Sequence, residues 1–147
     1  MLHNFTDMNK ILYKYIKIEL DQFAIFEDHI KNNQEEVQLE TSSTFQYDQE
    51  NHVICNTITV TFLNLDMPLM RAVSKSYFQI HTESLKQMTD DEHRIIFPQS
   101  VLVQFASLNY GTLRGMVHLK TLNTKLSNYI LPPMFFNEII TTDLEID

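Results

Sequence analysis

The stretch 53-VICNTITVTFLNLDMPLMRAVSKSYFQIH-81 decides the fold class of this chain. In its first part, Val53 to Leu63, apolar residues alternate with threonines and Cys55, which is typical of a strand on a pleated surface. The second part, Leu69 to His81, alternates in the same way. The link Asn64-Leu-Asp-Met-Pro68 is short and permits antiparallel neighbours, and Pro68 is expected to end the ladder of hydrogen bonds.

Two further strands are expected before this stretch, over Leu12 to Glu27 and Val37 to Tyr47. The first changes phase, so that Phe23 falls on the face that charges occupied before, and this predicts a bulge near Asp21-Gln22. Asp48-Gln-Glu-Asn51 suits a hairpin turn. The four strands therefore predict an antiparallel meander.

Helical spacing follows from Pro98, which suits a helix start, and predicts a helix of five or six turns. Gly111 and Gly115 lie on one face of it. Either another backbone approaches them closely, or Gly115 ends the helix. Leu131-Pro132-Pro133 predicts an extended segment, followed by a short helix from Met134 to about Thr141. Strands followed by helices indicate an α+β domain over residues 1–147, with flexible ends at 1–10 and 142–147.

Composition limits the class of protein. A length of 147 residues, 44% hydrophobic and 20% charged, is typical of one globular domain. The net charge of −8 argues against nucleic acid as a partner. The single Cys55 allows no internal disulfide and favours a reducing compartment. Residues Met1 to Lys10 show no basic segment followed by an apolar run, and nowhere do eighteen apolar residues follow one another. We expect a cytoplasmic protein that does not bind a membrane.

Residues for catalysis, a metal or a cofactor are not visible in the sequence. The six histidines lack the spacing of a zinc site, there is no G-x-S-x-G, and two glycines cannot build a phosphate loop. We expect a protein that is not an enzyme and has no cofactor. An enzyme that uses two carboxylates brought together by the fold stays as an alternative.

Three segments in order carry a resemblance: Arg94-Ile-Ile-Phe-Pro-Gln-Ser100, the helix reaching Leu113-Arg-Gly115, and Leu131-Pro-Pro-Met-Phe-Phe136. With the strands before them, over residues 11 to 141, they resemble the SecB family of export chaperones. The chain departs from export SecB in having more residues between Gly115 and Leu131 and a short last helix. These departures are similar to divergent SecB-like proteins, some of which serve antitoxins of toxin-antitoxin systems.

The resemblance implies an ATP-independent chaperone that holds unfolded clients, either precursors for Sec-dependent export or one antitoxin. It implies a homotetramer, a dimer of dimers, with the long helices at the interface, and we assign to that interface Phe105, Leu108, Gly111 and Gly115. It also implies an acidic sheet face that docks the ATPase SecA, for which the candidates are Glu19, Asp21 and Glu27.

Client contact needs exposed apolar side chains, and methionine suits it because its side chain is flexible. The candidates are Phe23, Phe26, Phe45, Tyr47, Met67, Met70, Met134, Phe135 and Phe136. Two adjacent aromatics after Pro132-Pro133 cannot both enter one core, so we expect a groove between them and the strand around Phe23 to Phe26. A small-ligand or lipid carrier with one deep pocket and a purely structural subunit remain as rival interpretations.

Overall fold

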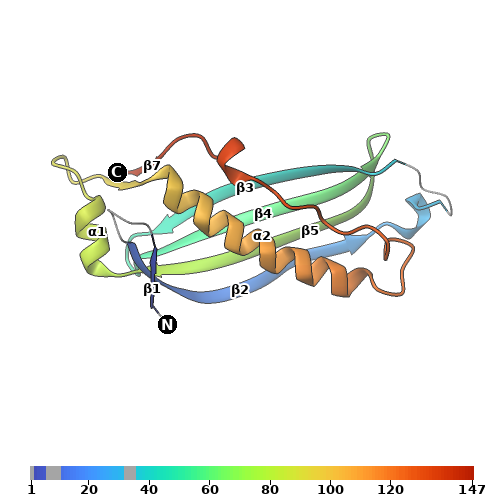
Figure 1. The fold of residues 1–147 in the computed structure, drawn as a ribbon, viewed down its shortest axis with the longest axis horizontal. Coiled ribbons are helices and arrows are strands. Elements are labelled where there is room, and N and C mark those ends of the chain that lie inside the picture. The colour runs from blue at the N-terminus through green and yellow to red at the C-terminus, as the bar shows by residue number, and fades with distance from the viewer. Residues whose placement is uncertain (1, 6–10, 32–35) are drawn as a thin grey trace.

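A computed structural model describes residues 2–5, 11–31 and 36–147. The main sheet is antiparallel, with strand order β1-β2-β5-β4-β3. Figure 1 shows the long helix α2 crossing this sheet diagonally. The strands are β1 (Leu2–Phe5), β2 (Ile11–Ile25), β3 (Gln38–Asp48), β4 (Val53–Asn64) and β5 (Met67–Ile80); the other elements are α1 (Thr82–Met88), β6 (Ile95–Phe97), α2 (Gln99–Thr121), β7 (Leu144–Ile146) and the 3-10 turns η1 (Glu27–His29) and η2 (Phe136–Glu138).

The four long strands and the helix after them confirm the predicted α+β class. Strand order differs from a simple meander at one place, because β2 pairs with β5 and not with β3. β3, β4 and β5 follow one another as hairpins, and the longer link after Ile25 carries the chain across the sheet, which is a Greek key order. Pro68 does not end the ladder: it lies in β5 opposite Leu63, where the register shifts.

The predicted bulge in β2 is confirmed between Leu20 and Gln22, and a second irregularity lies between Tyr15 and Lys17. Each inserts one residue, so the strand keeps its apolar side chains on one face while the sequence changes phase. Ile18, Leu20 and Phe23 face the same side of the sheet because they pair with Ser76, Ser74 and Ala72 of β5.

Helix α2 begins after Pro98 and runs for 23 residues through Gly115, so that glycine does not end it. The C-terminal region is less helical than expected, since the helix predicted from Met134 is only the turn η2. Residues 144–146, expected in a flexible end, form β7, which pairs with β6. The expectation for residues 1–10 falls mostly on residues outside the described part, where only β1 is seen. Sequence patterns also missed α1, whose first turn is capped by the His81 ring.

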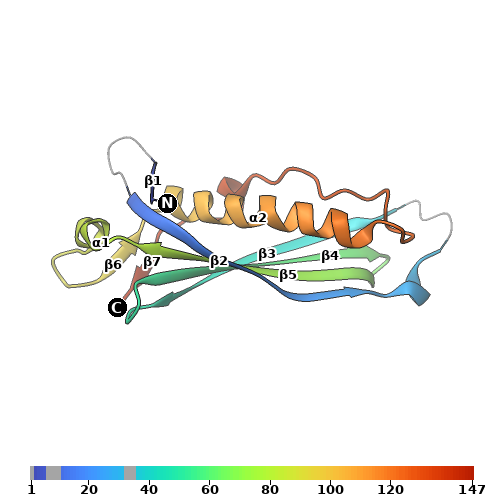
Figure 2. The same ribbon diagram turned by 90° about the horizontal axis from the view of Figure 1, so that it is seen from below.

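The sheet has one covered and one bare face. Figure 2 shows α2 and the chain that follows it on the same side, which we call the inner face, while no helix of the described residues covers the outer face. Inner residues form two buried clusters. One is rich in aromatics under the first half of α2, and the other is mainly aliphatic under the second half. Asn56, Ser74 and Asn109 are fully buried between them.

Candidate functional site

The chain after α2 exposes a run of apolar residues, which we call the apolar ridge: Ile130, Pro132, Pro133, Phe135 and Ile139. Phe135 is 68% exposed and Ile130 is 57% exposed. The two prolines hold this segment extended, and α2 fixes it through two hydrogen bonds to its carbonyls. The Tyr110 hydroxyl donates to the Pro132 carbonyl at 2.6 Å, and Arg114 Nε donates to the Leu131 carbonyl at 2.6 Å.

Adjacent aromatics of the ridge segment point in opposite directions. Phe136 is 1% exposed and packs edge-on against Tyr110, with ring centroids 5.5 Å apart. Its inclusion among client-binding residues was wrong, because the core already buries its ring. Phe135, the residue before it, leaves its ring in solvent and is the large aromatic most available to a partner.

The other predicted client residues divide by burial. Met70 is fully buried on the inner face and was wrongly assigned, whereas Met67 lies at the β4–β5 turn and is 48% exposed. The remaining five are half-buried: Phe23, Phe26, Phe45, Tyr47 and Met134. Phe135 is exposed while Phe23 packs against the mainly aliphatic buried cluster, and the groove expected between them stays a prediction.

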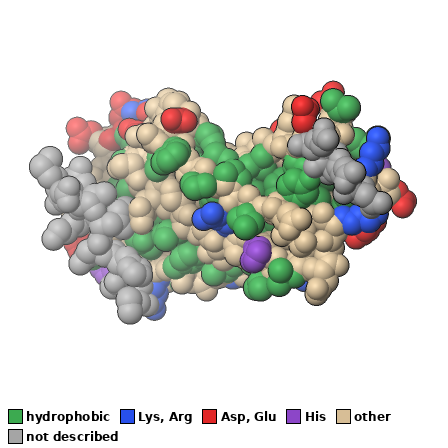
Figure 3. Space-filling model, turned by 45° about the vertical axis from the view of Figure 1, so that its right-hand side comes forward, with side chains coloured by type: hydrophobic (Ala, Val, Ile, Leu, Met, Phe, Trp, Pro, Cys, Tyr) green, Lys and Arg blue, Asp and Glu red, His purple; other side chains and the backbone are tan. Residues whose placement is uncertain are grey.

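Sequence patterns missed a second apolar surface on β2. Ile16 is 47% exposed and Ile18 is 49% exposed, although Ile18 belongs to the inner face. The diagonal course of α2 leaves this part of the face uncovered. Figure 3 shows hydrophobic side chains on both flanks of a hollow between the raised ends of the molecule. The alternation of β2 could have indicated this apolar surface of Ile16 and Ile18, but only together with the position of α2.

The four residues assigned to an oligomer interface have different surroundings. Phe105 is fully buried, with its ring 4.1 Å from that of Phe78, so it has no surface to offer and that assignment was wrong. Leu108 is half-buried. Gly111 and Gly115 are exposed, and a Cβ added at either would meet nothing within 4 Å. Close approach within this chain therefore does not explain these glycines.

The expected acidic docking face is not present on the sheet. Glu19 lies on the outer face, 3.3 Å from Lys17 Nζ, and accepts a hydrogen bond from the Tyr77 hydroxyl. Asp21 lies in the bulge and Glu27 lies in η1, so the three carboxylates form no common patch. By strand register, the described outer positions are mixed in charge, with basic Lys14, Lys17, Arg71 and Lys75 beside acidic Glu19, Glu40 and Asp48.

The titratable groups do not form a catalytic arrangement in the described part of the chain. Burial raises the pKa of the Cys55 thiol, which keeps it protonated at neutral pH. Burial, with the neighbouring Cys55 and Glu19, raises the pKa of Tyr77 to about 12. No group of three or more potential metal ligands occurs among the described residues.

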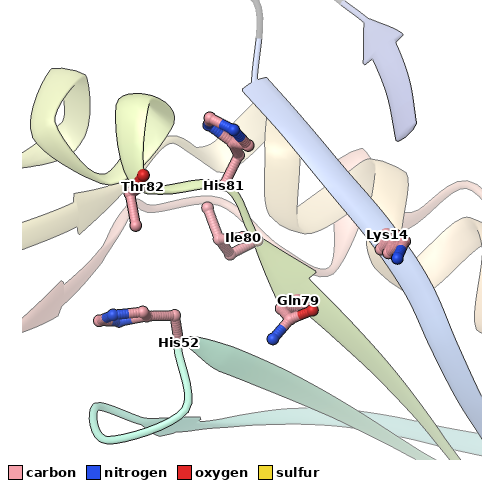
Figure 4. A pocket seen from close by; sticks show the side chains of 6 residues that line it. All are labelled: Lys14, His52, Gln79, Ile80, His81 and Thr82. Carbon is pink, nitrogen blue, oxygen red and sulfur yellow. The ribbon is translucent and has the colours of Figure 1, made fainter. Parts of the chain in front are cut away.

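The pockets are open and mixed in polarity. One, of about 350 Å³, lies beside the start of α1, and Figure 4 shows the rings of His52 and His81 there, on separate elements and apart from each other. His81 Nδ1 already accepts the Glu83 backbone N–H at 3.2 Å. Another pocket, of about 620 Å³, lies where Tyr47, Cys55 and Tyr77 come together. Neither is the enclosed apolar cavity that a lipid carrier needs.

Comparisons with known proteins show a similarity of structure but not of sequence family. No family model and no curated protein matches the chain. Among the described helices, none has the length and apolar character needed to cross a membrane. Among solved structures, the chain is similar to the Mycobacterium tuberculosis Rv1957 SecB-like chaperone in complex with a ChAD peptide from the Rv1956 HigA1 antitoxin. The sequence identity is 18%, the TM-score is 0.45, and the match covers 84% of this chain and 87% of that one.

Proposed function

We propose that this protein is an ATP-independent chaperone that is not an enzyme and holds unfolded polypeptides by their apolar segments. The apolar ridge is the observation that carries the proposal. In ten residues, from 130 to 139, the chain places five apolar side chains in solvent, of which Phe135 and Ile130 are the most exposed. Contiguous exposed apolar surface of this kind is rare on a soluble protein unless it binds something.

The ridge suits extended and varied clients. The two prolines hold its backbone open, so the ridge loses little conformational entropy when a client binds. Phe135 offers a large apolar contact, and Met134 beside it is flexible enough to fit clients of different shape. The net charge of −8 keeps the protein soluble despite this surface and favours basic clients.

The finer assignments rest on the sequence resemblance. The proposed clients are precursors for Sec-dependent export, and the alternative is one dedicated antitoxin. The proposed location is the cytoplasm, and the proposed assembly is a homotetramer built as a dimer of dimers. A general export chaperone should delay aggregation of many unrelated precursors, whereas a dedicated one should bind one antitoxin segment and leave the precursors to aggregate.

The test of the holdase proposal is aggregation of a denatured, reduced client on dilution, followed by light scattering. The wild-type protein should suppress scattering without ATP. Phe135→Ser should weaken capture by about tenfold or more, since burying a phenylalanine contributes about 1.5–3 kcal/mol. Leu119→Ser is the matched control, because Leu119 is 68% exposed, as Phe135 is, but lies on α2 outside the ridge and outside the predicted client residues. Equal suppression by Phe135→Ser and wild type would exclude the ridge as the client surface.

A further inference from the structure

Residues 143–147, which we call the strap, lie at the end of the molecule that carries α1 and β6 (Figure 2). Within the strap, β7 pairs with β6 in antiparallel register, with Glu145 opposite Ile96. Leu144 and Ile146 pack against the aromatic-rich buried cluster, while the three carboxylates between and beside them are exposed. The strap therefore binds the rest of the chain as an added strand whose apolar residues alternate with acidic ones, which is how many domains bind a peptide.

The strap is held by bonds that water can replace. β6 and β7 have three residues each, and a two-stranded sheet is marginally stable on its own. At the start of the strap, Asp143 Oδ1 accepts the Gln99 backbone N–H at 2.7 Å. At its other end, Gln49 Nε2 donates to the Asp147 carbonyl at 2.7 Å. Both bonds are exposed, so their exchange for bonds to water costs little free energy. A segment held in this way can open locally while the core stays folded.

The ion pair of the strap is shared with two other carboxylates. Arg94 Nη2 lies 2.9 Å from Asp90, which also accepts the Arg94 backbone N–H at 2.9 Å. Glu92 lies 3.7 Å from the same guanidinium, and Glu145 of the strap lies 3.4 Å from it. One positive charge faces three negative charges, and Asp90 makes the shortest contacts. Release of Glu145 therefore costs little, because Arg94 keeps its main partner and exposed ion pairs are weak.

A pocket of about 320 Å³ lies against Ile146 and Asp147. Apart from Tyr47 and Asp147 itself, the titratable side chains in its walls are basic: His52, Lys86 and His93. A peptide that follows the course of β7 lies beside this pocket and finds partners there for its carboxylates. This local charge is opposite to the net charge of −8 of the whole chain, so the site favours acidic segments that the rest of the surface repels.

We propose that the strap occupies a peptide-binding site on β6, and that an extended client segment with the same alternation of apolar and acidic residues displaces it. Displacement frees one edge of β6, Ile95–Phe97, whose backbone N–H and C=O groups can pair with an added strand. The strap is then a built-in competitor, because it lowers the fraction of chains whose site is open to a client. The client as displacing partner rests on the proposed function, whereas the strap as a separable peptide ligand does not.

A fluorescent peptide with the sequence of residues 141–147 is the probe, and fluorescence anisotropy measures its binding. Leu144→Ser with Ile146→Ser weakens the strap in the full chain. This double variant should bind the peptide about tenfold or more tightly than wild type, since the fraction of chains with an open site limits the apparent affinity. Leu119→Ser, at an exposed position of α2, is the matched control and should bind as wild type does.

The control peptide has serine in place of its leucine and isoleucine and should bind neither chain. Equal binding of the native peptide by the double variant and wild type overturns the proposal. Equal binding of the two peptides overturns it as well, because charge alone would then explain the binding.

A reversible lock tests the same site within one molecule. In a Cys55→Ser background, Ile96→Cys with Glu145→Cys places two thiols directly opposite each other, where Cβ atoms are about 4.5–5.5 Å apart and close to disulfide range. Oxidation should close the strap and abolish peptide binding, and reduction should restore it. Peptide binding that is the same in the oxidised and reduced forms would place the peptide elsewhere on the molecule and overturn the proposal.

Suppression of client aggregation on the same variants separates this inference from the proposed function. Suppression of an acidic, unfolded client should rise with Leu144→Ser and Ile146→Ser, and it should fall when the cysteine pair is oxidised. If the peptide binds as expected but suppression stays the same, the client is not the displacing partner and the strap site stands. If wild-type protein suppresses no aggregation at all, the holdase function fails, and peptide binding still decides whether the strap is a separable ligand.

Discussion

The two halves of the core are closed in different ways. The aromatic half, around Tyr13, Phe78, Phe97 and Phe105, is closed by helices and strands that pack ring on ring, with Phe78 and Phe105 stacked at 4.1 Å. The aliphatic half, around Ile58, Leu113 and Leu131, is closed by the extended segment after α2. Its cover carries the apolar ridge and is held to α2 by the hydrogen bonds of Tyr110 and Arg114. One half thus anchors the helix, and the other presents the apolar ridge, which is the proposed binding surface.

The buried polar residues between the halves fix how α2 lies on the sheet. Asn109 Nδ2 donates to Asn56 Oδ1 at 2.9 Å, and Asn109 Oδ1 accepts from the Ser74 hydroxyl at 2.8 Å. A helix that slid along the sheet would leave these groups without partners in a dry interior, which is costly. The difference between the halves therefore depends on a helix that is pinned between them.

The largest expected effect comes from opening the aromatic half. Phe105→Ala removes a fully buried ring that contacts both Phe78 and Tyr13, and it should lower the free energy of unfolding by about 3–5 kcal/mol. Urea unfolding followed by circular dichroism measures the loss. Leu119→Ala is the control on the same helix, because Leu119 is 68% exposed. A loss below about 1 kcal/mol would contradict the view that this half anchors α2.

A smaller effect is expected at the polar boundary. Asn109→Leu keeps the size of the side chain but leaves Asn56 Oδ1 and the Ser74 hydroxyl without their Asn109 partner. The expected loss is about 1–3 kcal/mol, measured in the same way. Ser107→Ala should change stability by less than about 0.5 kcal/mol, because its exposed hydroxyl bonds only a carbonyl of its own helix. Equal stability of both variants would mean that packing alone positions α2.

Much of this arrangement is visible in the sequence, because periodicity is local. Alternation located β3, β4 and β5 to within two or three residues, and Pro98 located the start of α2. Strand order is not local: the same alternation suits β2 beside β3 or beside β5. The link after Ile25 is long enough for the second arrangement but does not require it.

Exposure in the proposed binding surface could be predicted from the sequence only where the residues at one position decided it. Phe135 and Phe136 follow two prolines, and adjacent side chains on an extended segment point apart, so one of them had to leave the core. Met70 and Phe105 were misplaced because a period tells which residues share a face but not which face is covered. Ile18 was missed for the same reason, since its exposure follows from the diagonal path of α2.

The smallest loss of stability is expected in the segment after α2, which covers the aliphatic half of the core. Tyr110→Phe removes the hydrogen bond to the Pro132 carbonyl and should lower stability by about 0.5–1.5 kcal/mol at neutral pH. Hydrogen exchange should rise in residues 126–136 while the aromatic half stays protected. Exchange that rises equally in both halves would show that the cover does not open on its own.

The same variant has a defined pH dependence. Burial raises the pKa of Tyr110, and Arg114 only partly opposes this shift. A group whose folded pKa lies above its unfolded value, about 10 for tyrosine, stabilises the fold fully below that pH, and this contribution is lost as the pH rises through the folded pKa. Wild-type protein should therefore lose stability from about pH 10 upward, and Tyr110→Phe should lose less over the same range.

Thermal unfolding scans between pH 8 and 11 compare the two slopes, with Tyr13→Phe as the counterpart in the aromatic half, since burial raises the pKa of Tyr13 as well. If Tyr110→Phe and wild type fall with the same slope, the Tyr110 hydroxyl is not the group whose ionisation loosens the cover.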